Sequence, residues 1–190
     1  MALNRRTFFE TAIAAVTVGR SALAAQPAAL GYFAPAEESA HARTWMCWPS
    51  NPSIYGEPAA YFESVQEALG RLAAAIAQHE PVSMLAAAKH QALAARLCGS
   101  KVTLVDIQTD DMWARDSGPV FLRSGAGKAA ILDLNFNGWG GKQVHRWDRQ
   151  ISSSIAQLTG CAYIKSALTG EGGASNTMAM ARSFSPRVAG

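Results

Sequence analysis

Two carboxylates stand out because each lies in a short stretch rich in residues that build binding sites. Asp116 lies within Asp111-Met112-Trp113-Ala114-Arg115-Asp116-Ser117-Gly118-Pro119, and Glu171 precedes Gly172-Gly173. Between them lies Asp133-Leu134-Asn135-Phe136-Asn137-Gly138-Trp139-Gly140-Gly141-Lys142. A carboxylate can accept two parallel hydrogen bonds from a planar cation, and an aromatic ring can stack on that cation. Taken alone, the first stretch is equally typical of a structural turn in which Asp116 caps the backbone.

In this order and spacing, the three stretches resemble the agmatine deiminases, members of the guanidine-modifying superfamily that also includes bacterial peptidylarginine deiminases. The resemblance covers roughly Trp45 to Ala174. It implies hydrolysis of a guanidinium C–N bond, agmatine giving N-carbamoylputrescine and ammonia for putrescine and polyamine synthesis. The implied mechanism passes through a covalent intermediate on a Cys thiolate and needs no metal or cofactor. The implied fold is an α/β propeller of five ββαβ-type modules, of which this chain would form the first half.

The resemblance also implies roles for individual residues. Asp116 would clamp the guanidinium, and Trp113 would form part of the wall around that flat cation. Glu171 would be catalytic by hydrogen-bonding and orienting the catalytic His; a purely conformational role of the Glu-Gly-Gly turn is the alternative. From the residues themselves, we expect Arg115 to pair with a nearby carboxylate.

For the other residues of the motif stretches we expect mainly structural roles. Asp110 and Asp111 are predicted to cap loops rather than to transfer protons. The segment 135–141 is predicted to be a rim that lets the backbone approach a substrate. For Trp139, packing into the core and contact with the substrate are two alternatives of equal standing.

The catalytic Cys and His of the family have no counterpart in a matching context. The family pattern continues after the Glu-Gly-Gly turn with a His-x-Asp and ends with a Cys, whereas the four His of this chain all precede Glu171. We therefore expect this chain to be inactive as it stands. Residues 175–190 are interpreted as an aberrant tail, because Met178-Ala179-Met180-Ala181, read one base earlier, permits Asp-Gly-Asp-Gly as part of a family-like continuation. The nucleotide sequence tests this frameshift hypothesis.

The cysteines carry little information. Cys47, Cys98 and Cys161 are odd in number and lack the spacing of metal ligands. We expect them to be buried as small apolar residues, with a disulfide open if the compartment is oxidising.

The N-terminus is typical of an export signal. Asn4-Arg5-Arg6-Thr7-Phe8-Phe9 resembles a twin-arginine motif, and a short apolar run and Ala22-Leu23-Ala24 follow it. An ordinary Ala-rich helix is the alternative. Residues 1–24 are thus predicted to be removed after export by the twin-arginine machinery to the periplasm or the exterior, and residues 25–174 to form the deiminase-like domain.

Composition excludes some partners. Apolar residues make up 49% and charged residues 16%, as in globular chains, and the net charge is only +3. No basic run is interleaved with aromatic residues, so nucleic acid is not an expected partner, and the apolar N-terminal run is too short for a stable membrane anchor. The expected partner is a small guanidinium compound or peptidyl arginine; the oligomeric state stays open.

Strand-like and helix-like segments alternate along the chain, which predicts the α/β class. The predicted strands are 44–48, 82–86, 102–107, 120–122, 129–134 and 162–165, and the predicted helices are 58–78, 89–97 and 147–158. Three functions fit these observations. The first is an agmatine deiminase-like hydrolase, the second is a secreted peptidylarginine deiminase, and the third is a non-enzymatic periplasmic module that binds guanidinium compounds.

Overall fold

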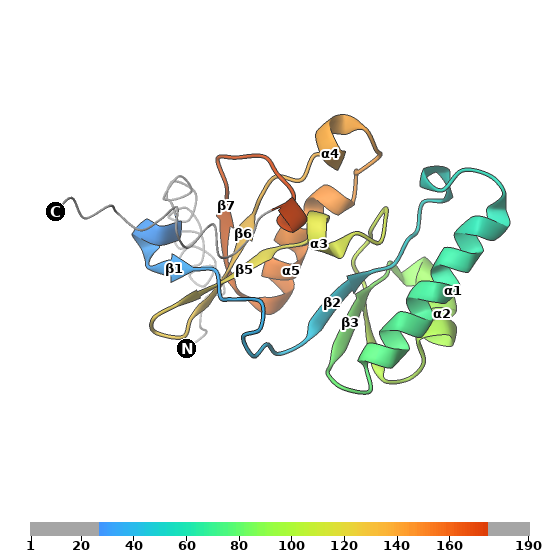
Figure 1. Cartoon of the computed structure of the whole chain (residues 1–190), viewed down its shortest axis with the longest axis horizontal. Helices are drawn as coiled ribbons and strands as arrows, with labels where there is room; N and C mark the ends of the chain where they lie inside the picture. Colours follow the sequence, from blue (N-terminus) through green and yellow to red (C-terminus); the bar gives the residue numbers. More distant parts are fainter. Residues whose placement is uncertain (1–26, 175–190) are drawn as a thin grey trace, which may run out of the picture.

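The computed structural model describes residues 27–174, which form two β-sheets lying side by side with helices packed against them (Figure 1). The predicted export signal and the predicted aberrant tail lie outside these residues. Across the described range, no helix is long and apolar enough to cross a membrane.

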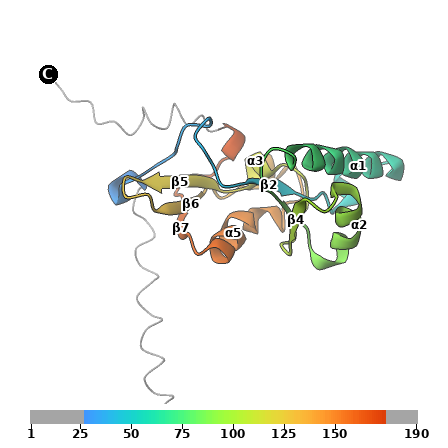
Figure 2. The same cartoon turned by 90° about the horizontal axis from the view of Figure 1, so that it is seen from below.

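The first sheet is parallel and is built by two helical crossovers. Its strands follow in the order β2, β3, β4, with Thr44 opposite Val82 and Val82 opposite Val102. The helices α1 and α2 connect them and pack on each other beside the sheet (Figures 1 and 2). The bounds are β2 Thr44–Cys47, α1 Ala59–Ile76, β3 Val82–Leu85, α2 Ala88–Cys98 and β4 Val102–Val105. All four residues of β3 are buried, as expected for a central strand covered on both faces.

The second sheet is mixed and has the strand order β1, β5, β6, β7. A hairpin joins β5 to β6, and the helix α5 returns the chain so that β7 lies parallel to β6. The bounds are β1 Tyr32–Phe33, β5 Val120–Ser124, β6 Ala129–Asp133, α5 Ile151–Thr159 and β7 Ala162–Lys165. From β5 onward the elements therefore run in the order ββαβ.

The two sheets share one apolar core, which fixes the end of β4 relative to α5. Cys47 and Leu85 of the first sheet pack in the same cluster as Ile131 of β6 and Ile151 and Ile155 of α5. Each of these side chains is at most 1% exposed. Val105 at the end of β4 and Ile107 pack against this cluster, and the loop that follows carries the Asp116 stretch.

The α/β class and every predicted strand and helix are confirmed, with small differences at their ends. Pro58 precedes α1 rather than opening its first turn, and the third predicted helix begins with a 3₁₀ turn, Asp148–Gln150. Gly160 has the left-handed conformation (φ 69°, ψ 10°). Gly99, which follows α2, combines positive φ with extended ψ (φ 76°, ψ 174°). Both sheets are open over residues 27–174, so these residues by themselves do not form a closed propeller.

Candidate active site

Asp110 and Asp148 form a buried, reciprocal pair of caps at the base of the site. The backbone amide of Asp110 donates to Asp148 Oδ1 at 2.7 Å, and the amide of Trp147 donates to Asp110 Oδ2 at 2.6 Å. Asp111 also donates its amide to Asp148, at 3.2 Å to Oδ2. These bonds join the loop after β4 to the start of the α5 segment. The predicted capping role of Asp110 is confirmed, and its partner Asp148 was not singled out in the sequence.

Asp111 accepts three hydrogen bonds in the same buried region. Its Oδ1 accepts from the Tyr55 hydroxyl and from the amide of Met112 at 2.7 Å, and its Oδ2 accepts from Gln143 Nε2 at 2.7 Å. The side chain of Asp111 is 1% exposed, so it is unreachable by solvent or substrate. The carboxylate therefore fastens three segments together, and the predicted loop-capping role of Asp111 is confirmed.

Burial changes the protonation of this cluster. Loss of solvent raises the pKa of Asp148 to about 7, with the neighbouring charges of Asp110 and Asp111 acting in the same direction against the two backbone hydrogen bonds. Burial, the hydrogen bond to Asp111 and its charge also raise the pKa of Tyr55. The Tyr55 hydroxyl thus stays a donor at any working pH.

Asp116 lies five residues after Asp111, in the short helix α3 (Ala114–Ser117). The carbonyl of Trp113 accepts the amides of Asp116 and Ser117 at 3.0 Å each, and Ser117 Oγ donates to it at 3.0 Å. This turn points the Asp116 carboxylate away from the Asp110 cluster and toward the other two motif stretches. This helical turn therefore separates Asp116 from Asp111 within the first motif stretch.

The Asp116 carboxylate brings all three motif stretches together. Its Oδ2 accepts from Trp139 Nε1 at 3.1 Å, and its Oδ1 accepts from the amide of Gly173 at 3.1 Å. The two glycines after Glu171 are needed for this approach, because a Cβ on Gly172 would lie 2.4 Å from the Arg115 carbonyl oxygen and one on Gly173 would lie 2.2 Å from Asp116 Oδ1. Apart from the presence of the three stretches, nothing in the sequence indicates these hydrogen bonds.

The segment 135–141, predicted as a rim, forms a left-handed helical turn, α4 (Gly138–Gly141). All four of its residues have positive φ, and Asn137 Oδ1 caps it by accepting the Gly140 amide at 2.8 Å. The Trp139 ring is half-buried and packs edge-on against Phe136, with ring centroids 5.0 Å apart and planes at 89°. Trp139 is thus neither fully in the core nor simply free for a substrate.

Glu171 and Trp113 are the other two predicted site residues. The half-buried Glu171 side chain makes no hydrogen bond or ion pair within the described range 27–174, and only its backbone carbonyl accepts, from Ala174 at 3.1 Å. Trp113 is 49% exposed. The roles of Glu171 in orienting a His and of Trp113 in walling the cation stay predictions. The predicted ion pair of Arg115 is confirmed, and its partner is Glu37, which lies far away in the sequence.

Of the three cysteines, neither Cys47 nor Cys98 is an activated nucleophile. All three are free thiols; Cys47 and Cys98 are buried and Cys161 is half-buried. Burial, reinforced by the charges of Asp148 and Asp111, raises the pKa of Cys47 well above its ordinary value, and burial raises that of Cys98 to about 11. Both thiols are therefore protonated at neutral pH, whereas attack on a carbon requires the thiolate.

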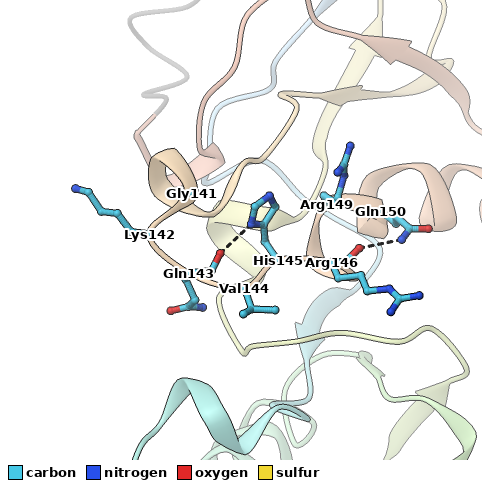
Figure 3. Close-up of a pocket in the computed structure, with 8 residues that line it drawn as sticks. All are labelled: Gly141, Lys142, Gln143, Val144, His145, Arg146, Arg149 and Gln150. Carbon is cyan, nitrogen blue, oxygen red and sulfur yellow. Dashed lines mark hydrogen bonds between the residues drawn. The ribbon is translucent and has the colours of Figure 1, made fainter.

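Next to the site lies an open hollow of about 780 Å³ with a cationic lining. Figure 3 shows the charged ends of Lys142, Arg146 and Arg149 pointing in three different directions, and Arg146 lies over the Trp147 ring at 4.7 Å. Among the residues that line the hollow there is no carboxylate. A guanidinium cation would be repelled there, so Asp116 is the better candidate for its site.

Comparison with known proteins agrees with the three stretches. Residues 33–177 match the model of the family described as Porphyromonas-type peptidyl-arginine deiminase. The agmatine deiminase of Ectopseudomonas mendocina is 39% identical over 148 residues, covering 73% of this chain and 39% of that protein. The agmatine deiminase of Stutzerimonas stutzeri is 37% identical over 146 residues, with the same coverage of 73% and 39%. The chain spans about two fifths of the length of these curated relatives.

A solved structure agrees with the fold as well. The agmatine deiminase of Enterococcus faecalis, described as catalysing its reaction, superposes with a TM-score of 0.72 at 25% identity, covering 80% of this chain and 42% of that one. The chain thus has an α/β fold similar to that of the solved agmatine deiminase. This chain belongs to the Porphyromonas-type peptidyl-arginine deiminase family.

Proposed function

We propose that this chain is the guanidinium-clamping part of an agmatine deiminase-like hydrolase, the enzyme type that converts agmatine and water to N-carbamoylputrescine and ammonia. The observation that carries the proposal is Asp116. It is half-buried and held from two sides by Trp139 and Gly173, and the half-exposed Trp113 lies three residues before it in the sequence. A carboxylate offers about four lone-pair sites, and Asp116 uses two, so it keeps acceptors for the N–H fork of a guanidinium.

The rest of the catalytic cycle lies with groups that this chain does not supply. No His-x-Asp occurs in the 190 residues, and the buried thiols are protonated. In the propeller that we propose, the present ββαβ unit and the parallel sheet before it would be followed by further modules carrying the nucleophile and the His. The Glu171 carboxylate, which has no side-chain partner among residues 27–174, would then orient that His. The 190-residue chain is expected to bind agmatine without releasing ammonia.

A chimera separates binding from turnover. Residues 33–174 of this chain would replace the matching part of the Ectopseudomonas mendocina enzyme, and ammonia release from agmatine would be measured. We expect release from the chimera and none from the 190-residue chain, while calorimetry detects agmatine binding to both. Putrescine, which lacks the guanidinium, is the control ligand. A folded but inactive chimera, or equal binding of putrescine and agmatine, would refute the proposal.

Peptidyl arginine is a second candidate substrate, favoured by the description of the matched family. Both substrates present the same guanidinium to Asp116, so the clamp does not separate them. Assays of the chimera with agmatine and with a short arginine peptide decide between the two substrates. Preferential turnover of the peptide would replace the agmatine proposal.

We also propose export by the twin-arginine pathway, supported by the residues 4–9 and the small-residue site at 22–24. Replacing Arg5 and Arg6 by Lys should retain the chain in the cytoplasm, as detected by cell fractionation. Unchanged export of that variant would exclude the pathway.

A further inference from the structure

The Asp116 carboxylate needs a means of holding its orientation, because the side chain lies on a four-residue helix at the molecular surface. Each carboxylate oxygen accepts one hydrogen bond, from Trp139 Nε1 on Oδ2 and from the Gly173 amide on Oδ1. The two donors come from different motif stretches, and together they fix the plane of the carboxylate. By count, one lone-pair site then remains on each oxygen, which is the arrangement that a bidentate guanidinium requires.

The backbone conformation at Trp139, which allows this contact, is energetically unfavourable for a residue with a side chain. Gly138, Gly140 and Gly141 adopt positive φ freely, but Trp139 has a side chain and still lies at φ 54°, ψ 49°. A side chain in the left-handed region costs roughly 1–2 kcal/mol. Glycine at this position would avoid that cost. The presence of Trp therefore indicates that the indole side chain itself has a role.

Neighbouring groups hold the turn and the ring in place. The Asn137 side chain accepts the Gly140 amide at 2.8 Å, and the Lys142 amide donates to the Gly138 carbonyl at 2.9 Å. Gly138 is packed so closely that a Cβ would lie 2.5 Å from the Gln143 carbonyl oxygen. The buried Phe136 ring meets the indole edge-on. The indole N–H is therefore aimed by a rigid support, as expected of a group that positions another.

We propose that Trp139 is a positioning residue for guanidinium recognition: the left-handed turn holds its indole N–H on Asp116 Oδ2, so that the carboxylate presents its remaining lone pairs to the cation. This inference rests on the proposed function. It adds a role that a purely structural Trp139, packed only on Phe136, would not have.

The test uses the whole chain and the variant Trp139→Phe, which keeps an aromatic ring beside Phe136 and removes the donor. Agmatine affinity, measured by calorimetry, should fall about tenfold, the effect of losing a hydrogen bond to a charged group. Trp147→Phe is the matched control, because the Arg146 guanidinium lies over the Trp147 ring and, within residues 27–174, this ring makes no hydrogen bond with Asp116. Thermal melting of both variants checks that they fold.

A nuclear magnetic resonance readout separates positioning from packing. The ¹⁵N-labelled chain gives one indole signal for each of its five tryptophans, and Trp139→Phe identifies the signal of Trp139 by deletion. Asp116→Asn should shift this signal selectively, and agmatine should shift it in the wild type. An unmoved Trp139 signal in Asp116→Asn, or equal agmatine affinity of Trp139→Phe and wild type, overturns the proposal. If the signal depends on Asp116 but the wild type binds no guanidinium compound, the contact stands, whereas the proposed function and the positioning role both fall.

Discussion

Two carboxylates five residues apart, Asp111 and Asp116, have opposite surroundings. Asp111 is 1% exposed and accepts hydrogen bonds from Tyr55, Gln143 and the Met112 amide. Asp116 is half-buried and, among the residues that the structure describes, accepts two, from Trp139 and Gly173. The first therefore holds segments of the chain together, and the second keeps acceptor capacity for a ligand. In this loop, chemical availability is decided by the number of donors around a carboxylate rather than by residue type.

Removing the buried carboxylate should have the largest effect on stability. Asp111→Ala leaves the Tyr55 hydroxyl, the Gln143 amide and a backbone amide without their acceptor, and we expect a loss of about 3–5 kcal/mol in the free energy of unfolding. Asp111→Asn is the matched control. It should lose only about 1 kcal/mol, since the Gln143 amide can rotate to present its oxygen to the new Nδ2. Urea denaturation measures both, and equal stability of Asp111→Ala and wild type would remove the distinction drawn above.

The pH dependence of stability sharpens the buried half of the comparison. Because the pKa of Asp148 is raised from 3.8 to about 7 in the folded protein, the folded state binds the extra proton. Its stabilisation is full below pH 4 and is lost as pH rises through about 7, by up to about 4 kcal/mol at 1.36 kcal/mol per pH unit.

The variant Asp148→Asn isolates this contribution. It should flatten the decline in the free energy of unfolding between pH 5 and pH 8, whereas the exposed-site control Glu63→Gln should not. Other titrating groups, including His90 with its pKa lowered by burial, are the same in both proteins and cancel in the difference. Parallel curves for Asp148→Asn and wild type would show that Asp148 does not take up the proton.

The close approach of Gly173 to Asp116 gives a smaller effect, confined to binding. A Cβ at Gly173 would lie 2.2 Å from Asp116 Oδ1, so Gly173→Ala must turn the carboxylate away from its two donors. Agmatine affinity should fall about tenfold to a hundredfold, as for a lost hydrogen bond to a charged group. Gly170→Ala is the control, because nothing lies within 4 Å of its Cβ position. Calorimetry compares the two, and equal affinities would remove the Gly173 contact from the site.

The exposed ion pair between Arg115 and Glu37 should have the smallest effect. Both side chains are more than half exposed, so Glu37→Gln should lower the free energy of unfolding by less than about 1 kcal/mol. Glu38→Gln, at the exposed neighbouring position, serves as the reference. A larger loss in Glu37→Gln, measured by denaturation at low and high salt, would show that this pair anchors the Asp116 turn.

The regular elements could be predicted from the sequence because local patterns determine them. The β-branched run at Val102 and the glycine-bounded hairpin near Gly125 each identify their own element. The two-residue β1 was missed because it is ordered only by pairing with β5. The left-handed turn at Trp139 was missed for a related reason, since a non-glycine residue adopts that backbone only when tertiary contacts enforce it.

The site was predictable as a set of residues but not as a geometry. The motif stretches named Asp116, Trp113 and Glu171, and the capping of Asp110 followed from its loop. Asp148 accepts hydrogen bonds from the amides of Asp110 and Asp111, which lie 38 and 37 positions away. Gln143 and Tyr55 donate to Asp111 from 32 and 56 positions away, and nothing local indicates such pairs. The position of Asp148 at the start of the predicted third helix was the one local indication that it caps a backbone segment.

The most direct measurement of the central claim is the variant Asp116→Asn in the 190-residue chain, followed by calorimetry with agmatine and by thermal denaturation. Asparagine keeps one oxygen for one of the two donors, so stability should fall by about 1 kcal/mol or less. It removes the charge and turns an amide donor toward a cation that has only donors. Agmatine affinity should therefore fall by about 2–5 kcal/mol, roughly thirtyfold to several thousandfold. Near-wild-type affinity combined with a large loss of stability would contradict the account and make Asp116 a structural cap like Asp111.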